Sequence, residues 1–334
     1  MLPGAYIFGC AGQALSDEER AFFRDSAPWG FILFARNIDT PDQLRALVED
    51  LRESVGRQAP VLIDQEGGRV QRLGPPHWRQ WAPPLDFIEA AGEKAERAMF
   101  LRYRIIAAEL MELGIDVNCV PCADVATDDT HPFLRNRCYG TTADDVARLA
   151  RAAATGLHAG GVLPVLKHIP GHGRGTVDSH LGLPATDTAP EALDAQDFAA
   201  FRALSDLPLG MTAHMVYAAY DPENAATVSR RVIRLIRERI GFGGLLMTDD
   251  LSMEALGGTM TTRTRASLAA GCDIILHCNG EMAEMREIAA EAGRLSAPAN
   301  DRARRALRLR TRPQPIDIRD AEAELKALGA GLLT

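Results

Sequence analysis

The chain has 334 residues, 46% of them apolar and 25% charged, and a net charge of −8 at pH 7. This composition is that of a globular protein with a large core, and the negative charge argues against a nucleic-acid partner or an anionic membrane surface, because both bind excess Lys and Arg. No apolar run approaches the roughly 18 residues of a membrane span, so no membrane partner is expected.

The N-terminus and the six cysteines indicate where the protein resides. Residues 1–12 lack the basic start and the long apolar segment of a secretory signal. One C-x-x-C pair, Cys119 and Cys122, has no second pair at zinc-site spacing, so packing is the favoured role of these thiols. Free thiols and no signal together predict a cytoplasmic protein.

Short apolar segments alternate with amphipathic ones along the chain. The predicted strands are Gly4–Phe8, Gly30–Phe34, Val61–Asp64, Asp116–Pro121, Val162–His168, Leu209–His214, Gly244–Asp249 and Asp273–His277. The helical patterns between them include Pro41–Val55, Glu93–Leu113, Ala143–Ala159, Pro190–Leu204 and Ser229–Ile240. Ser229 is a plausible N-cap for the last of these helices, and glycines that follow the segments act as stop signals.

Eight strand–helix alternations predict an α/β protein, a single (β/α)8 TIM-type barrel. Because no linker or change of composition divides the chain, we expect one catalytic domain over residues 1–334 with a helical tail at its C-terminus. Six arginines between Arg302 and Arg312 fit a solvated face of that tail. A doubly wound open sheet is the alternative, but it would carry fewer strands, and no G-x-G-x-x-G turn is present.

Polar residues stand where the predicted strands end. They are Asp64, Lys167 with His168, His214, Asp249 with Asp250, and His277 with Asn279. Barrel enzymes build their active sites from the carboxyl ends of several strands. These residues therefore predict a polar pocket at that end of the barrel.

The densest group of chemically active residues follows the fifth strand. Lys167 and His168 open a segment that continues through His172 to Asp178 and His180. A His-rich surface loop is the alternative, but buried Lys and His at a strand end require a reason. The glycines at 171, 173 and 175 predict a mobile loop that closes on substrate and brings His180 to the leaving group.

These residue types permit glycoside hydrolysis with retention of configuration. Asp249, at a strand end, suits a nucleophile, whereas Asp250 is expected to cap the next segment. His180 suits a proton donor and acceptor, with Asp178 favouring its protonated form. A carboxylate nucleophile and a tuned acid/base are what a retaining glycosidase needs. The segment from Asp64 to Arg72 adds groups that can hold sugar hydroxyls.

A divalent metal site is the rival interpretation. Its ligands would be His168, His172, Asp178, His180 and Asp249. Against it, the chain has no H-x-H or H-E-x-x-H pattern, and Lys167 places a cation beside His168. We predict that no metal and no cofactor takes part, and a metal-dependent barrel hydrolase stays the alternative.

Four segments together resemble the β-N-acetylglucosaminidases of glycoside hydrolase family 3. They are Asp64-x-Glu66-Gly67-Gly68-Arg69-Val70, Lys167-His168-x-Pro170-Gly171-His172-Gly173 with Asp178-Ser179-His180, Met211-Thr212-Ala213-His214, and Thr248-Asp249-Asp250-Leu251-Ser252-Met253. The resemblance runs from about residue 4 to Asn279. It implies a barrel fold and, for single-domain members, cytoplasmic removal of N-acetylglucosamine from 1,6-anhydro-muropeptides during cell-wall recycling.

The resemblance also implies roles for single residues. Asp249 would be the nucleophile, His180 the acid/base and Asp178 its dyad partner. Contacts to the terminal sugar would come from Asp64, Arg72, Arg137, Lys167, His168 and His214. Residues 130–134, which precede Arg137, depart from the Asn-Pro usual in the family, so the role of Arg137 is the least secure.

The expected partner is a small carbohydrate or muropeptide, and a monomer is favoured. Two further readings stay open. Phosphate could replace water as the acceptor, because a neutral His repels phosphate less than a carboxylate does. A sugar-binding protein without activity is disfavoured, because Asp249 and the Asp178–His180 pair are present.

Overall fold

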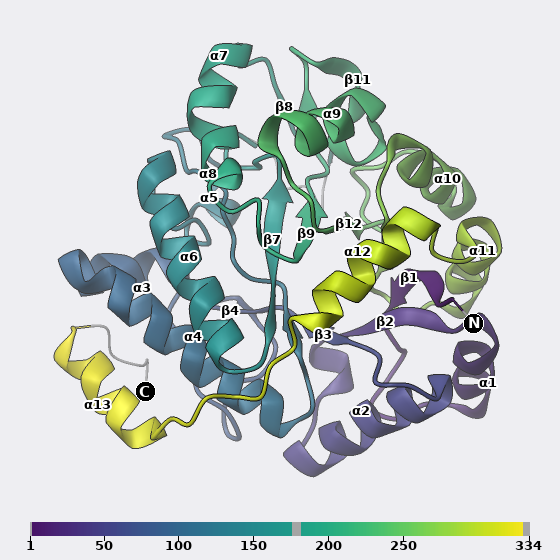
Figure 1. Ribbon diagram of the computed structural model, residues 1–334, viewed down its shortest axis with the longest axis horizontal. Helices are drawn as coiled ribbons and strands as arrows, with labels where there is room; N and C mark the ends of the chain where they lie inside the picture. Colours follow the sequence, from purple (N-terminus) through teal and green to yellow (C-terminus); the bar gives the residue numbers. More distant parts are fainter. Residues whose placement is uncertain (1, 176–181, 330–334) are drawn as a thin grey trace.

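The computed structural model describes residues 2–175 and 182–329. Eight parallel strands close into a barrel in the order β1-β13-β12-β9-β7-β6-β3-β2, which confirms the predicted (β/α)8 fold (Figure 1). The strands are β1 (Gly4–Phe8), β2 (Pro28–Leu33), β3 (Val61–Ile63), β6 (Val117–Asn118), β7 (Leu163–Ile169), β9 (Leu209–Thr212), β12 (Leu245–Asp250) and β13 (Ile274–His277). Each predicted segment overlaps one of them.

Helices surround the barrel, most of them on its outer face (Figure 1). They are α1 (Asp17–Ser26), α2 (Pro41–Val55), α3 (Pro84–Ala91), α4 (Ala95–Glu112), α5 (Pro132–Arg135), α6 (Ala143–Ala159), α7 (Pro190–Ala192), α8 (Phe198–Arg202), α9 (Arg230–Leu235), α10 (Met260–Ala270), α11 (Met282–Ala292), α12 (Ala297–Arg308) and α13 (Ile318–Ala327). A π-helical turn joins α7 to α8, and another extends α9 to Ile240. The predicted bounds of α2 and α6 are confirmed.

Local signals explain where several helices begin and end. The Thr40 side chain accepts a hydrogen bond from the backbone N–H of Gln43, and Pro41 fills the first position of α2. Ser229 caps α9 as predicted, because its hydroxyl accepts from the Val232 N–H at 3.2 Å. Gly241 ends the same helical segment with a φ of 82°, a conformation that favours glycine.

Short strands outside the barrel shape the loops at its carboxyl end. The strands β4 (Gln65–Gly67) and β5 (Val70–Gln71) form an antiparallel pair after β3. A three-stranded sheet joins β8 (Ala185–Thr186), β10 (Val216–Tyr217) and β11 (Asp221–Ala225). Both structures fix loops that surround the mouth of the barrel.

The apolar core has two layers. One lies between the sheet and the helices, and the other fills the barrel. Helix α12 contributes Ala299, Ala303 and Ala306 to the inner layer, so it covers the amino-terminal end of the barrel (Figure 1). Its small residues allow the helix to approach the strand ends closely.

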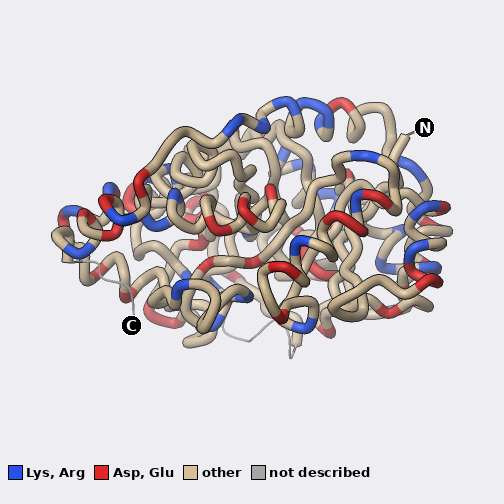
Figure 2. Tube along the Cα trace, turned by 90° about the horizontal axis from the view of Figure 1, so that it is seen from below, with Lys and Arg blue, Asp and Glu red and all other residues tan. Residues whose placement is uncertain are grey.

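Of the six arginines in the tail, Arg304, Arg305, Arg308 and Arg312 are exposed, as expected of a solvated face, whereas the other two are anchored by ion pairs. Arg302 pairs with Asp273 at 2.9 Å, and Arg310 pairs with Asp116 at 2.7 Å. Both acids precede barrel strands. Figure 2 shows basic and acidic residues interleaved along the outer elements of the molecule.

All six cysteines are buried and free, as expected from their packing. Within residues 2–175 and 182–329, no helix combines the length and hydropathy needed to cross a membrane. The predictions on thiol packing are confirmed.

Candidate active site

A cavity of about 220 Å³ lies at the carboxyl ends of the barrel strands. Residues of six barrel strands or their carboxyl ends, β2, β3, β7, β9, β12 and β13, converge on it together with residues of the neighbouring loops. Six of the predicted site residues line it, namely Asp64, Arg72, Arg137, Lys167, His168 and Asp249. Asp178 and His180, the predicted acid/base dyad, lie outside the described residues.

Lys167 is the centre of a buried ion-pair network. Its Nζ lies 2.9 Å from Asp64 Oδ1 and 2.6 Å from Glu66 Oε1, and its side chain is only 2% exposed. Arg72 contacts the other oxygen of Asp64 at 3.2 Å. Arg137 binds Glu66 with two hydrogen bonds of 2.8 and 2.9 Å. Two carboxylates and three cations thus share one rigid cluster.

The network keeps its members ionised. Burial opposes the charge on Lys167, but Asp64 and Glu66 outweigh it and raise the pKa of the ammonium group. Burial likewise opposes ionisation of Glu66, yet Arg137 and Lys167 lower its pKa to about 2. Lys167 and Arg72 hold the pKa of Asp64 below its usual range against the same effect of burial. The cavity floor therefore offers fixed charges to the hydroxyls of a ligand.

Asp124 orients His168, and sequence reasoning missed it. Its Oδ2 lies 2.7 Å from His168 Nδ1, and its Oδ1 accepts the backbone N–H of His172 at 2.6 Å. Burial raises the pKa of Asp124, but His168 and His172 lower it more. The carboxylate therefore accepts a hydrogen bond from the Nδ1–H group. His168 lines the cavity, so Nε2 is the ring nitrogen that remains for a ligand.

Asp249 ends strand β12 and lines the cavity. Burial opposes its charge, but His168 and His214 lower the pKa of the carboxyl group. Its Oδ1 also accepts the N–H of Asp250 at 2.8 Å. The side chain is thus an ionised carboxylate at the barrel mouth, as a nucleophile requires.

Asp250 has the structural role that was expected of it. Its Oδ1 accepts the backbone N–H groups of Ser252 and Cys278, each at 3.1 Å. Its Oδ2 accepts the Ser252 hydroxyl at 2.6 Å. These bonds tie the turn after β12 to the end of β13.

His214 and His277 differ from the expected convergent pocket. The ring nitrogens of His214 contact the Thr227 hydroxyl at 2.7 Å and the Asp250 carbonyl at 2.9 Å, and His214 is not among the described residues that line the cavity. His277 turns towards Glu284, 2.7 Å away. A strand-end position predicts the right end of the barrel for a side chain, but not the direction in which it points.

The glycines after β7 are required for packing. A Cβ atom on Gly173 would lie 1.8 Å from the carbonyl oxygen of Val125, and Gly171 has a φ of 134°. The Thr130 hydroxyl donates to the Gly173 carbonyl at 2.5 Å. Gly171 and Gly173 therefore have packing roles, and the mobility of the loop remains a prediction.

His172 and Cys122 also lie close to His168. Burial, with His168 nearby, lowers the pKa of His172 to about 4, so its ring is neutral. Cys122, Asp124 and His168 have possible metal-ligand atoms within 4.8 Å of one another. The Cys122 thiol lies 3.2 Å from Asp124 Oδ2, so the thiol and the imidazole both meet this carboxylate at hydrogen-bond distance.

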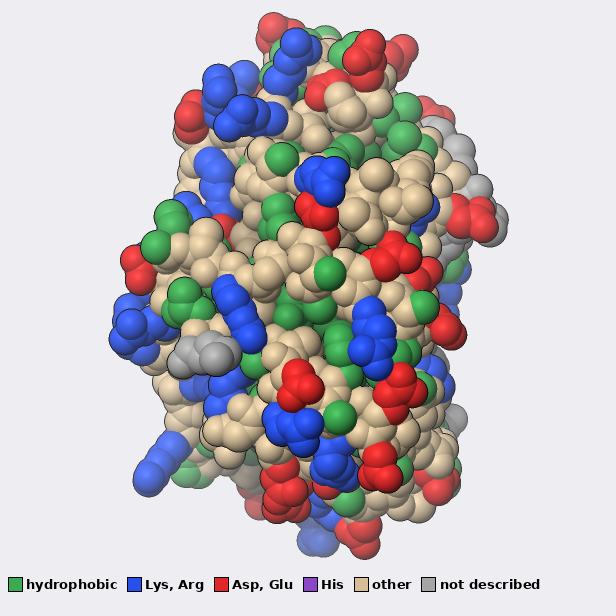
Figure 3. All heavy atoms as spheres, turned by 90° about the vertical axis from the view of Figure 1, so that its right-hand side faces the viewer, with side chains coloured by type: hydrophobic (Ala, Val, Ile, Leu, Met, Phe, Trp, Pro, Cys, Tyr) green, Lys and Arg blue, Asp and Glu red, His purple; other side chains and the backbone are tan. Residues whose placement is uncertain are grey.

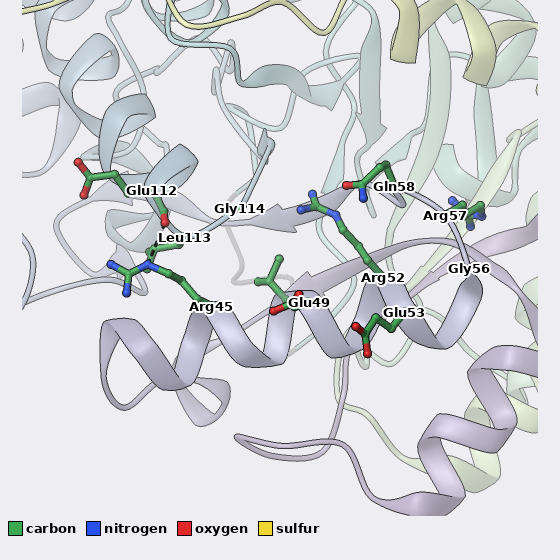
Figure 4. Close-up of a pocket in the computed structure, with 11 residues that line it drawn as sticks. Arg45, Glu49, Arg52, Glu53, Gly56, Arg57, Gln58, Glu112, Leu113 and Gly114 are labelled. Atoms are coloured by element: carbon green, nitrogen blue, oxygen red, sulfur yellow. Dashed lines mark hydrogen bonds between the residues drawn. The ribbon is translucent and has the colours of Figure 1, made fainter.

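A second hollow, of about 920 Å³, lies at the other end of the barrel between α2 and the turn after α4 (Figure 4). The arginine side chains that line it donate hydrogen bonds to backbone carbonyls of the protein. Arg45 donates to the Glu112 carbonyl at 3.1 Å, and Arg52 donates to the Ala59 carbonyl at 3.1 Å. We therefore place the candidate active site in the smaller cavity.

Known proteins share this architecture. The family model for the glycosyl hydrolase family 3 N terminal domain matches residues 9–309. A β-hexosaminidase of Methylococcus capsulatus is 36% identical over 301 residues, which are 89% of each chain. A family 3 β-N-acetylglucosaminidase from Paenibacillus sp. is 33% identical with a TM-score of 0.81, over 91% of this chain and 60% of that one. NagZ from Neisseria gonorrhoeae, in complex with N-trifluoroacetyl-D-glucosamine, is 29% identical with a TM-score of 0.84, over 99% and 97% of the two chains.

Proposed function

Because the chain belongs to glycosyl hydrolase family 3 and is a glycoside hydrolase, we propose that it is a retaining exo-β-N-acetylglucosaminidase. Its substrates would be peptidoglycan fragments that end in N-acetylglucosamine, such as the disaccharide with 1,6-anhydro-N-acetylmuramic acid, with or without peptide. The ionised Asp249 in a cavity with a floor of fixed charges carries this proposal. The activities named for the relatives support it.

The proposed reaction has two displacements. Asp249 attacks the anomeric carbon and forms a covalent glycosyl–enzyme, while the leaving oxygen receives a proton. Water then attacks the same carbon from the side that the aglycone left, and Asp249 is released. Two inversions at one carbon retain the β configuration.

The network around Lys167 would position the terminal sugar. Asp64 would accept hydrogen bonds from sugar hydroxyls, and Lys167, Arg72 and Arg137 would donate them. His168 would contact the sugar through Nε2, because Asp124 occupies Nδ1. His214, bound at both ring nitrogens, would act by supporting the charge on Asp249.

His180 would supply and remove the proton, with Asp178 as its partner. The support is chemical, because an imidazole titrates near neutral pH and an adjacent carboxylate favours its protonated form. His180→Ala should retain more activity towards a dinitrophenyl glycoside than towards a natural disaccharide, since a good leaving group needs no proton.

Covalent labelling tests the role of Asp249. With a slow 2-fluoro or 5-fluoro glycoside, mass spectrometry should place the sugar on Asp249, and Asp249→Asn should lower kcat by at least ~10³-fold. The neighbouring Asp250→Asn is the control. It should be less stable than the wild type but should still be labelled on Asp249. A label on Asp250, or retained activity in Asp249→Asn, would contradict the assignment.

The same assay tests the alternatives. Chelator should leave kcat unchanged if no divalent ion takes part, whereas loss of activity that returns with added zinc or manganese would favour the metal-dependent hydrolase. In phosphate buffer, a sugar 1-phosphate product would identify phosphorolysis. We further propose that the protein is a cytoplasmic monomer. The six free thiols support the cytoplasmic location.

A further inference from the structure

Arg102 of α4 places a positive charge in the interior of the protein. Its side chain is fully buried, and its Nε and Nη1 atoms have no hydrogen-bond partner among the described residues. Its guanidinium carbon lies between 4.6 and 5.6 Å from the centroids of three aromatic rings, those of Phe87, Trp81 and Tyr103. Burial of a charge opposes folding, and an apolar side chain could fill the same space, so the position calls for a specific role.

Arginines at the surface have a different environment. On the side of the molecule shown in Figure 3, basic and acidic side chains are interspersed. Arg265 of α10, for instance, is exposed and pairs with Glu291 at 2.8 Å. Such exposed pairs contribute little to stability. Arg102 instead directs its donors at the backbone behind the cavity floor.

The contacts of Arg102 fix the backbone of Glu66. Its Nη2 donates to the Glu66 carbonyl at 2.5 Å and to the Ala82 carbonyl at 2.8 Å. A Cβ atom on Gly67 would lie 1.9 Å from the same nitrogen. The guanidinium group therefore fills the space that this glycine leaves, and it prevents the backbone of residues 66–67 from moving towards α4.

Tyr103, the next residue of α4, joins Glu66 to the loop that carries Arg137. Its hydroxyl donates to the Glu66 carbonyl at 3.2 Å, so it accepts the proton of the Tyr139 hydroxyl, which lies 3.0 Å away. Tyr139 is buried and follows Arg137 by two residues. Two adjacent residues of one helix thus hold both partners of the Glu66–Arg137 ion pair.

Glu66 transmits these contacts to the cavity. It is buried, and its carboxylate binds Lys167 at 2.6 Å and Arg137 at 2.8 Å. Lys167 and Arg137 both line the cavity. A shift of the Glu66 backbone would therefore displace two of the donors that the floor presents to a sugar.

We propose that Arg102 and Tyr103 are positioning residues for the terminal sugar, which act by holding Glu66 and through it Lys167 and Arg137. This inference rests on the proposed function, because it takes the terminal sugar to be bound by these donors. The floor contacts the sugar both before and during bond cleavage, so the two residues set the affinity for the sugar more than the rate of the chemical step.

Arg102→Met tests the role of the guanidinium group. KM and kcat are measured with a nitrophenyl N-acetyl-β-glucosaminide, and the Kd of N-acetylglucosamine is measured by calorimetry. KM and Kd should each rise about tenfold, the lower end of the usual effect of removing a supporting residue, whereas kcat should change little. Arg102→Lys keeps the charge and part of the donor capacity, so its KM and Kd should lie between those of the wild type and Arg102→Met.

Arg104→Met is the matched control on the same helix. Arg104 is also buried, and it donates to a backbone carbonyl, that of Gln314 in the segment between α12 and α13. Burial lowers the pKa of both arginines. In thermal denaturation Arg104→Met should lose stability as Arg102→Met does, but its KM and Kd should equal those of the wild type.

Tyr103→Phe provides a milder second variant, which removes one hydroxyl and keeps the ring. Its KM and Kd should rise about threefold, the effect of one hydrogen bond. Tyr6→Phe is its control, because the Tyr6 hydroxyl donates to the Ser26 carbonyl at 2.6 Å in the layer between the sheet and the helices. It should leave KM and Kd unchanged.

Unchanged KM and Kd in Tyr103→Phe and in a folded Arg102→Met, or equal rises in the controls, would overturn the inference while the glycosidase assignment stands. If Arg102→Met does not fold, Tyr103→Phe decides alone. A wild-type enzyme that does not cleave the N-acetylglucosaminide would instead contradict the proposed function, and this inference with it.

Discussion

Lys167 and Asp124 show how buried charges organise the cavity at the scale of single residues. Lys167 holds two carboxylates through one ammonium group. Asp124 holds one imidazole and the backbone N–H groups of His168 and His172. A substitution that removes one partner leaves the other charged groups buried without compensation, so it should affect both activity and stability. Matched control variants are needed to separate the two effects.

Asp124→Asn should lower kcat/KM by about 10–100-fold, the usual effect of losing the partner that orients a functional histidine. The amide keeps the size of the carboxylate but presents a donor to His168 Nδ1, which exchanges the protonated and free ring nitrogens. The pH profile of kcat/KM should change together with the rate.

The control for this variant is Asp273→Asn at the opposite end of the barrel. Asp273 is also buried, and it binds Arg237 and Arg302. It should lose stability but keep kcat/KM and its pH profile. If Asp124→Asn loses stability alone, Asp124 is merely structural.

At the scale of elements, the sequence predicts which strands form and which residues end them, because apolar segments and glycine stops are local signals. It does not reveal Asp124 as a partner of His168, since that contact joins residues 44 positions apart in the chain. Glu66 lies within a predicted motif, yet its pairing with Arg137 depends on the path of the loop that carries Arg137. The prediction that His277 points into the pocket was wrong for the same reason, because the ring turns towards Glu284 on α11.

The glycine-rich segment after β7 offers a test at this scale. Gly173→Ala should destabilise the protein by about 1–3 kcal/mol, because the added methyl group overlaps the Val125 backbone and forces one segment to move. Because the same loop carries His172 and follows His168, kcat should fall as well. Chemical denaturation and steady-state kinetics would measure both effects.

Gly257→Ala serves as the control, since a Cβ there meets nothing within 4 Å. It should be neutral in both measurements. A neutral Gly173→Ala would show that the Val125 segment yields easily and that the glycine serves mobility, as the sequence first suggested.

The whole molecule divides its work between the two ends of the barrel. The amino-terminal end is closed by α12, whose Arg302 binds Asp273 and whose alanines enter the core. The carboxyl end carries groups with shifted pKa values, among them Glu66, lowered to about 2, and His172, lowered to about 4. The carboxyl end therefore contributes to the pH dependence of the stability.

The sign of that dependence follows from proton binding. Folding lowers the pKa of His172 from 6.5 to about 4, so the unfolded chain binds more protons between these values and stability falls as pH falls from 6.5 to 4. Glu66, lowered from 4.5 to about 2, continues the loss below pH 4.5 in the same direction. The lowering of the His172 pKa corresponds to a contribution of about 3 kcal/mol to the free energy of unfolding, which is lost at low pH.

We therefore expect the free energy of unfolding to decline between pH 6.5 and pH 4, with His172 as a main source of the decline. Urea denaturation at pH 8, 6.5, 5 and 4 would measure it. In His172→Gln this part of the decline should shrink, whereas His77→Gln, a substitution at an exposed position, serves as the control and should follow the wild type. Parallel curves for the wild type and His172→Gln would mean that another group titrates in this range, and the neutral, buried state of His172 would no longer explain the acid sensitivity.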